Sequence, residues 1–338
     1  MNFDAAQNEI FLYTDLLTGN TEKEIAIAYR SAFKEIDKKL KNLYLKIQDQ
    51  GIPKEEIYNY LSQYNRLKNL RESIVIEYNN AFQSSKNSTL SNSTRVMTEQ
   101  FYRETYLLNW GLDIPPFTVL DARVIDAAAT GRIQTWGDLA KVYGPQTGYI
   151  PQAGTLAATL KANNIKNLTD ISRALNQALI TGESYTKTAK KMRDLFNGIA
   201  SNSMRVARTE GTRTMNAGNY ANVWHARSEG VDIVRHWLAT LDAVTRRTHQ
   251  IADNKPEDKN GIFHVGNATG NYPGNMSTAG ESINCRCSVR NQVPNFSPKT
   301  RRGKDPLTGE SDLISFKTFD EWMDSKGMKL TKSGWIKV

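Results

Sequence analysis

Two cysteines separated by one residue carry the clearest chemistry in the sequence. Cys285 and Cys287, the chain's only cysteines, flank Arg286 in INCRCSV. On an extended backbone, residues two apart point to the same side, so both sulfurs would face one point. A disulfide between them would close a strained ring, because their Cα atoms would be roughly 6.5–7 Å apart. The pair therefore predicts a thiolate function in a reducing compartment, either half of a metal site or a redox pair.

Two histidines and an aspartate upstream could complete a metal site. His249 and Asp253 lie four residues apart in TRRTHQIAD, on one face of a helical turn if that piece is helical. His264 follows in GIFHV. Zinc accepts tetrahedral sets of Cys, His and carboxylate ligands, and Cys285 and Cys287 with His249, and either Asp253 or His264, make such a set. The alternative is a strand with two small buried cysteines, and histidines that cap loops.

The predicted zinc is structural, because the sequence offers no separate general base and no obvious substrate pocket. We therefore assign no catalytic residue and no residue that binds an organic cofactor. As a hypothesis, zinc on Cys285, Cys287 and His249 holds together loops that bury little apolar surface of their own.

The first third of the chain must form helices. Thr21 and Glu24 have the spacing of a capping box. A stripe of apolar residues, three or four positions apart, follows Glu24. Its members are Ile25, Tyr29, Phe33, Ile36, Leu40, Leu43 and Ile47. Gly51 and Pro53 end this helix, and a second one from about Pro53 continues through Tyr78. We expect a helical hairpin whose stripes face an intramolecular core rather than a partner's coiled coil.

Polar and Pro-rich stretches suggest the divisions of the chain. SSKNSTLSNST at 84–94 predicts a loop or hinge, and Pro115-Pro116 and a Gly/Pro-rich loop at 144–155 follow. The expected ranges are an N-terminal helical hairpin region (1–84), a linker with short helices (85–154), the region with the Cys pair (155–292) and a C-terminal tail (293–338). The tail carries a small amphipathic unit around Phe316, Phe319, Trp322, Met323 and Trp335.

The third range begins with helices and ends with strands. Ser184 is a predicted N-cap, and the helix after it exposes Lys187, Lys190, Lys191 and Arg193. This basic face is either a solvated surface or a phosphate-contacting one. VDIVRHWLAT alternates like a strand, and short apolar pieces among Gly, Asn and Pro follow it. The sequence thus predicts a mainly α-helical α+β fold with a small β and loop unit near the C-terminus.

Composition limits the classes of protein. The chain has 338 residues and a net charge of +9, which suits either a polyanionic partner such as nucleic acid or ordinary solubility. No run of about 18 apolar residues is present, so we expect no membrane span. Acidic residues in MNFDAAQNEIFLYTDLL argue against a signal peptide.

The segment 160–292 resembles the phage Mu protein F family of minor head proteins. The matching text is Ala207-Arg208-Thr209-Glu210 with Asn216, Trp237, Asp242, Thr245-Arg246, His249, Asp253, Phe263, Pro273-Gly274 and Asn284-Cys285-Arg286-Cys287. Two positions depart from the family pattern. Asn254 follows Asp253 where the family has Gly, ahead of the charged insertion NKPEDKNG, and Asn275 replaces the Asp of Pro-Gly-Asp. The loss of that carboxylate weakens a role for this loop as an oxygen ligand.

The resemblance implies a protein made in the host cytoplasm and built into the virion. It implies a place in the capsid interior near the portal protein and other head proteins. It also implies non-specific contact with packaged double-stranded DNA and exit with that DNA on infection. In this role the chain would not be an enzyme.

The sequence also leaves two enzymatic alternatives to the assembly role. Arg208-Thr209-Glu210 is faintly similar to elements of ADP-ribosyltransferase toxins, although Arg and Glu are almost adjacent here and in a helical context. A metal-dependent nuclease could use His249, His264 and Asn284, although cysteines are poor partners for the magnesium of such enzymes.

Overall fold

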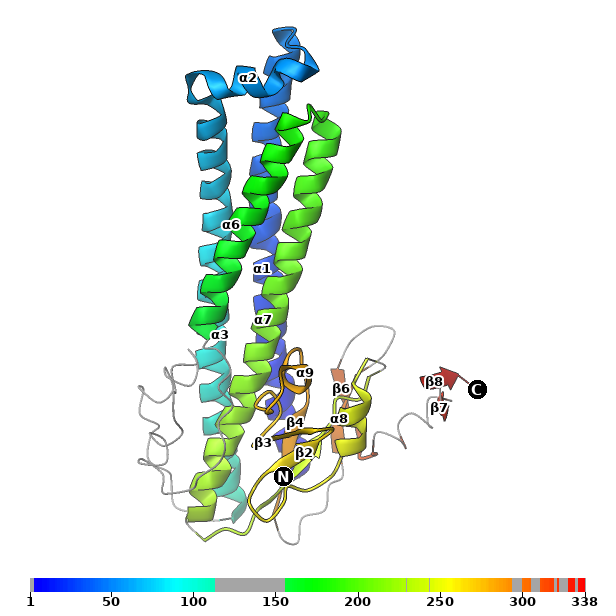
Figure 1. Ribbon diagram of the computed structural model, residues 1–338. Helices are drawn as coiled ribbons and strands as arrows, with labels where there is room; N and C mark the ends of the chain where they lie inside the picture. Colours follow the sequence, from blue (N-terminus) through cyan, green and yellow to red (C-terminus); the bar gives the residue numbers. More distant parts are fainter. Residues whose placement is uncertain are drawn as a thin grey trace. The chain divides into compact units, whose positions relative to one another are not determined.

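Long helices make up most of the protein. The computed structural model describes residues 3–112, 156–228, 230–242, 244–293, 300–304, 311–318, 321, 328–331 and 334–337. The helices are α1 (Phe3–Asp49), η1 (Lys54–Glu56), α2 (Ile57–Ser62), η2 (Gln63–Asn65), α3 (Arg66–Leu112), α6 (Leu156–Ile180), α7 (Tyr185–Ser228), α8 (Arg247–Ala252) and α9 (Ala279–Ser282) (Figure 1). The mainly α-helical α+β class is confirmed.

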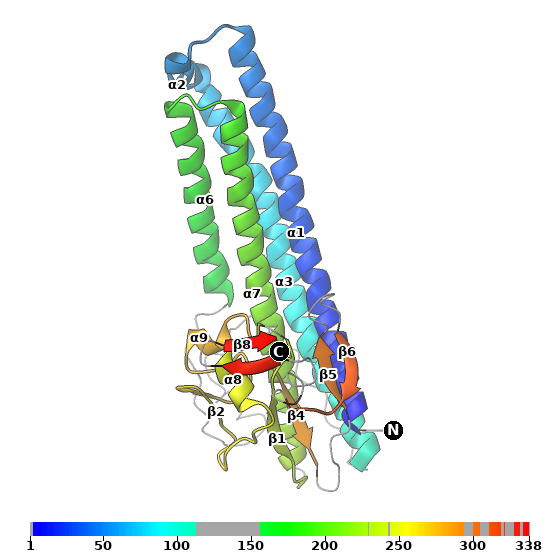
Figure 2. The ribbon, with the colours of Figure 1, turned by 90° about the vertical axis from the view of Figure 1, so that its right-hand side faces the viewer.

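The strands are short and pair two by two. They are β1 (Val234–Leu238), β2 (Phe263–Val265), β3 (Ala268–Gly270), β4 (Ser288–Gln292), β5 (Thr300–Lys304), β6 (Ser311–Ser315), β7 (Met328–Thr331) and β8 (Gly334–Lys337). The antiparallel pairs are β1 with β4, β2 with β3, β5 with β6, and β7 with β8 (Figure 2). The strand expected in VDIVRHWLAT is β1.

The structure corrects two expected boundaries in the first helices. Thr21 lies inside α1, eighteen residues after Phe3, so it does not begin a helix. The second helix is interrupted after α2, where Tyr64 and Asn65 have positive φ angles of 50° and 57°. Non-Gly residues rarely adopt this conformation, although Asn tolerates it better than most. The expected stop at Gly51 and Pro53 is confirmed, because α1 ends at Asp49.

The polar stretch 84–94 is helical, where a loop or hinge was predicted. It lies within α3, and Ser85 and Thr89 are buried. Thr89 Oγ1 donates a hydrogen bond to the Ser85 carbonyl, one turn earlier, at 2.8 Å. Small side chains that satisfy their hydroxyls on their own helix can face a neighbouring helix at close range. Composition alone did not distinguish this from a solvated loop.

The chain forms two compact units, each made of separated segments. The helical unit comprises residues 20–91 and 154–207, and the mixed unit comprises 1–19, 92–153 and 208–338. The four ranges predicted from the sequence stay a prediction, since these units interleave along the chain. Pro115-Pro116, the loop at 144–155, and Phe319, Trp322 and Met323 lie outside the described residues.

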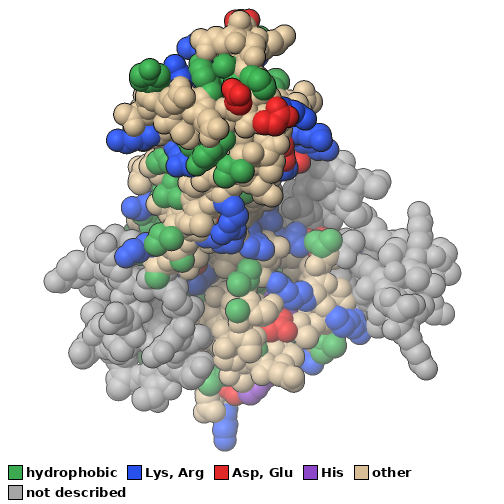
Figure 3. Space-filling model, turned by 45° about the horizontal axis from the view of Figure 1, so that its top comes forward, with side chains coloured by type: hydrophobic (Ala, Val, Ile, Leu, Met, Phe, Trp, Pro, Cys, Tyr) green, Lys and Arg blue, Asp and Glu red, His purple; other side chains and the backbone are tan. Residues whose placement is uncertain are grey.

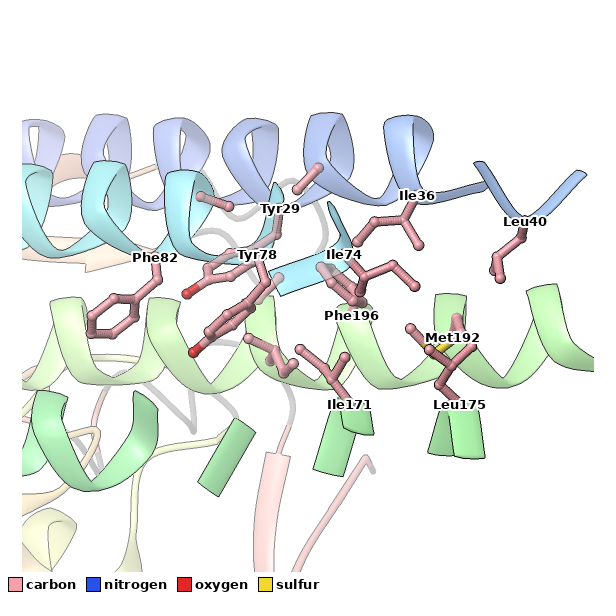
Figure 4. Packing of buried hydrophobic residues seen from close by; sticks show 14 of the residues in the cluster. Tyr29, Ile36, Leu40, Ile74, Tyr78, Phe82, Ile171, Leu175, Met192 and Phe196 are labelled. Carbon is pink, nitrogen blue, oxygen red and sulfur yellow. The ribbon is translucent and has the colours of Figure 1, made fainter. Parts of the chain in front are cut away.

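The helical unit has one apolar core built by α1, α2, α3, α6 and α7. Figure 4 shows Tyr29 and Ile36 of α1 facing Tyr78 of α3 and Phe196 of α7. The rings of Tyr78 and Phe196 meet edge to face, with centroids 6.4 Å apart. Four members of the predicted α1 stripe, Ile25, Ile36, Leu40 and Ile47, are buried here too. The hairpin therefore packs intramolecularly, as expected from its periodicity.

The mixed unit packs short strands and loops on the second half of α7. Its largest core contains Trp237, Leu241, Phe263, Tyr272, Val289 and both cysteines, and Ala217 of α7 lies against them. Gly218 allows a close approach between α7 and α3, because a Cβ there would lie 2.7 Å from the Met97 carbonyl oxygen. The loop that carries Cys285 and Cys287 therefore packs on α7.

Within the described residues, no helix combines the length and apolar character needed to cross a bilayer.

Candidate metal centre

The cysteine pair lies in a loop that leads into β4. Cys285 and Cys287 are both nearly inaccessible to solvent and make no disulfide. Asn216 of α7 donates to the Cys287 carbonyl oxygen at 3.0 Å and to the Pro273 carbonyl oxygen at 3.2 Å. Thr209 Oγ1 accepts from the Asn284 backbone N–H at 2.9 Å, and Asn284 has a φ of 57°. The turn before the pair is therefore fastened to α7.

His249 on α8 meets the two sulfurs. Its Nδ1 lies 3.3 Å from Cys287 Sγ and 3.7 Å from Cys285 Sγ. The three candidate ligand atoms lie within 4.8 Å of one another, and all three residues are buried. The ring packs edge-on against Trp237 of β1, with centroids 5.3 Å apart. Two sulfurs and one imidazole nitrogen within this distance are the donors that zinc prefers.

The second nitrogen of His249 faces a carboxylate. Nε2 lies 2.9 Å from Glu281 Oε2, on α9. Thr248 Oγ1 donates to the same oxygen at 2.9 Å. Histidines that bind metals commonly direct their other nitrogen to a carboxylate, which fixes the tautomer and makes the ring more basic. Glu281 was not among the residues predicted from the sequence, because no motif links an acid four residues before a Cys-x-Cys pair to the histidine.

The surroundings favour the deprotonated form of one cysteine, Cys287, over that of the other. Burial raises the pKa of the Cys287 thiol, but hydrogen bonds with Cys285 and His249 bring it well below its ordinary value. The hydrogen bond to Cys287, and burial, raise the pKa of Cys285 well above its ordinary value. Burial disfavours charge on His249, yet its hydrogen bond with Cys287 and that residue's charge raise its pKa. Cys287 is thus stabilised in the deprotonated form that metals bind.

The structure places the other two predicted ligands away from the sulfurs. α8 ends at Ala252, so Asp253 leaves the helical face of His249. Its carboxylate accepts hydrogen bonds from Arg301 at 2.8 and 3.0 Å, and from the Ala239 backbone N–H at 2.8 Å. His264 is 62% exposed and its Nε2 lies 2.9 Å from Asp258 Oδ2. Of the five predicted ligands, His249, Cys285 and Cys287 are brought together.

The residues on which the enzymatic alternatives depend have other partners. Arg208 Nη1 donates to Asn284 Oδ1 at 3.1 Å, and Glu210 pairs with Arg213 at 2.8 Å. His264 pairs with Asp258, and although Asn284 lines a pocket with His249, its side-chain oxygen accepts from Arg208.

Comparison with known proteins supports the resemblance seen in the sequence. Residues 169–290 match the family described as Phage Mu protein F like protein. Over 328 residues the chain is 26% identical to Minor head protein GP7 of Bacillus phage SPP1, which covers 95% of this chain and 97% of that protein. Residues 169–290 are thus Mu F-like, and the chain as a whole is similar to a phage minor head protein. The resemblance first carried by the cysteine motif is thereby confirmed.

A second relative is an enzyme by name. The chain is 30% identical over 153 residues to NAD(+)--arginine ADP-ribosyltransferase EFV of Enterococcus faecalis strain ATCC 700802 / V583. The match covers 45% of this chain, but the chain spans only 31% of that relative's length. No solved structure matches the chain.

Proposed function

We propose that this Mu F-like chain is a minor capsid protein that takes part in head morphogenesis of a tailed phage. It acts inside the capsid near the portal protein, contacts packaged double-stranded DNA and leaves with it on infection. The observation that supports this proposal most directly is the match to Minor head protein GP7 along almost all of both chains.

DNA contact is assigned to the helical unit on grounds of charge. Residues 20–91 and 154–207 contain 20 Lys and Arg against 12 Asp and Glu, so this unit carries +8 of the chain's net charge of +9. Lys and Arg side chains are numerous on the surface seen in Figure 3. Phosphates attract such a surface without reading the base sequence, since binding releases condensed counterions. This charge supports a non-specific contact with packaged DNA.

The proposed metal is zinc, in a supporting role. It would be held by His249, Cys285 and Cys287, and it would join α8 to the loop before β4. Exchange of Cys285 for Ser should lower both zinc content and the melting temperature, because metal binding to a folded site contributes directly to folding free energy. Zinc content is read by elemental analysis of the purified chain. Full zinc with an unchanged melting temperature would reject the proposal.

The assembly role is tested on particles. Virions and procapsids of a phage that encodes this chain are purified, and their proteins are quantified by mass spectrometry before and after DNA ejection. We expect the chain in both particles in far fewer copies than the major head protein, cross-linked to the portal, and depleted after ejection. A chain that is absent from purified procapsids contradicts the proposal.

Arginine ADP-ribosylation is the second candidate, because the relative from Enterococcus faecalis bears that name. Labelled NAD⁺ incubated with the purified chain and an arginine-rich acceptor protein decides it. Transfer of label that is lost in Glu210→Gln would favour the enzyme over the assembly role.

A further inference from the structure

A small pocket opens directly onto the three candidate ligands. It has a volume of about 130 Å³, and His249, Cys285 and Cys287 are part of its wall. This space is more than the roughly 10–15 Å³ that one water molecule needs. Val244 lies at the same pocket and is 75% exposed. The pocket therefore opens to solvent at Val244, while the three ligands themselves are buried.

The polar side chains around this pocket are already committed to other partners. The Asp242 carboxylate lies 2.5 Å from Arg286 Nη1 and accepts from Thr245 Oγ1 at 2.9 Å. Thr245 Oγ1 also lies 2.6 Å from the Thr240 carbonyl oxygen. The side-chain oxygen of Asn284 accepts from Arg208. Each of these oxygens would have to give up an existing hydrogen bond or ion pair before it could bind a metal together with the sulfurs.

The remaining acids nearby are also excluded as a fourth ligand. Glu281 contacts Nε2 of His249, whereas the sulfurs lie at Nδ1. Asp253 is held by Arg301. Among the described residues, the group of His, Cys, Asp and Glu that could share one metal ion contains His249, Cys285 and Cys287 alone.

We infer that the zinc has an open fourth position, facing the pocket and filled by water that a small anion can replace. This inference rests on the zinc proposed above and changes its character. Zinc sites closed by four protein ligands are structural, whereas sites with three protein ligands and a solvent ligand remain reactive towards exogenous groups. The site is a Lewis-acid centre accessible to small ligands, not a sealed crosslink.

The charges around the pocket favour an anion as the replacing ligand. Two thiolates neutralise the charge of Zn²⁺, so the metal itself contributes no net positive charge once Cys285 and Cys287 are deprotonated. Arg246 and Arg286 both line the pocket, and because Arg286 is paired with Asp242, Arg246 provides the positive charge there. The small volume suits a compact ion such as azide.

Cobalt substitution tests the open position on the full-length chain. Co²⁺ replaces zinc during refolding or exchange, and its visible absorption reports the ligands around the metal. We expect one Co²⁺ per chain, and a saturable shift of the d–d bands when azide is added. Val244→Trp should abolish the shift over the azide range that saturates the original chain, because the indole fills the mouth of the pocket, while cobalt content stays the same.

Ile251→Trp is the matched control. Ile251 is also an exposed apolar residue of this region, 51% accessible on α8, but it does not line the pocket. This variant should keep the azide response. A cobalt spectrum that azide leaves unchanged, or a shift that Val244→Trp leaves intact, overturns the open position while the zinc proposal survives. A chain that binds no cobalt or zinc overturns both, and the assembly role is still judged separately from virions.

Discussion

The contact between Glu281 and His249 allows a test of the centre that leaves all three ligands in place. Glu281→Gln removes the charge that supports the imidazole but preserves the size of the side chain. We expect zinc affinity to fall about 10- to 100-fold, the usual effect of losing such a partner. Competition with a zinc chelator measures the change.

A matched acid and histidine lie elsewhere in the same unit. Asp258 and His264 form an exposed pair 2.9 Å apart, outside the cysteine site. Asp258→Asn and His264→Ala should leave the affinity for zinc as it is, whereas His249→Ala should abolish binding. Loss of zinc from His264→Ala would restore His264 as a ligand.

Asp253 has a structural task that can be separated from metal binding. Its carboxylate and Arg301 are both buried, at 2% and 0% side-chain exposure. Asp253→Asn leaves a buried guanidinium without its counter-charge, which costs about 3–5 kcal/mol for a pair of this kind. We expect a lower free energy of unfolding in urea, with one zinc per chain still bound at native conditions. Normal stability with lost zinc would instead make Asp253 a ligand.

The candidate site was partly readable from the sequence. Three residues that the fold brings together could be identified from the spacing of Cys285 and Cys287 and from the position of His249 upstream. The fourth position could not be found in this way. Asp253 has the spacing of a ligand, but its carboxylate accepts a hydrogen bond from Arg301, forty-eight residues further along the chain. Glu281 contacts His249, yet no spacing in the sequence indicates this contact.

At the scale of elements, periodicity predicted helices well where their stripes were apolar. The α1 stripe from Ile25 to Ile47 has a clear repeat and is buried as expected. The repeat disappears at 84–94, because Ser, Thr and Asn fill the packing positions of α3 there. Residue size, not apolar character, makes that contact, so a hydrophobic pattern does not detect it.

A buried carboxyl group joins elements of the mixed unit and makes its stability depend on pH. Glu104 of α3 accepts hydrogen bonds from Asn219 of α7 at 2.7 and 2.8 Å and from Gln100 at 2.7 Å. Asn291 of β4 donates to it at 3.4 Å. Burial, opposed by these amide donors, raises the pKa of Glu104 to about 7. No Lys or Arg hydrogen-bonds to this carboxyl within the described residues.

The sign of the pH dependence follows from this raised pKa. Below pH 4.5 the group is protonated whether the chain is folded or unfolded, and its contribution to stability is fully present. Between 4.5 and about 7 only the unfolded chain loses the proton, so stability falls, by about 3 kcal/mol in all. Glu104→Gln, which cannot ionise, should remove this fall. Urea unfolding at pH 5 and pH 8 measures it, and an equal fall in both proteins would exclude Glu104 as its source.

At the scale of the whole molecule, charge is distributed unevenly between the units. The helical unit carries +8, and the mixed unit, which contains the candidate metal centre, carries the remaining +1. Within the helical unit, Lys187, Lys190 and Arg193 lie exposed on α7, while Lys191 pairs with Glu183 at 2.5 Å. This uneven distribution of charge could not be predicted from the net charge of the chain. Basic residues are spread along the sequence, and the excess in the helical unit becomes visible only once the fold shows that residues 20–91 and 154–207 form one unit.

Charge reversal on α7 tests whether this distribution serves DNA binding. Lys187→Glu with Lys190→Glu should weaken binding to double-stranded DNA by about 10-fold at low salt, and should lower the slope of log affinity against log salt by about 2, one for each lost phosphate contact. Fluorescence anisotropy on duplexes of unrelated sequence measures both. Lys255→Glu with Lys259→Glu is the control, because it makes the same change in net charge at exposed positions of the mixed unit. If both pairs weaken binding equally, DNA responds to the total charge of the chain and the helical unit has no special part in holding it.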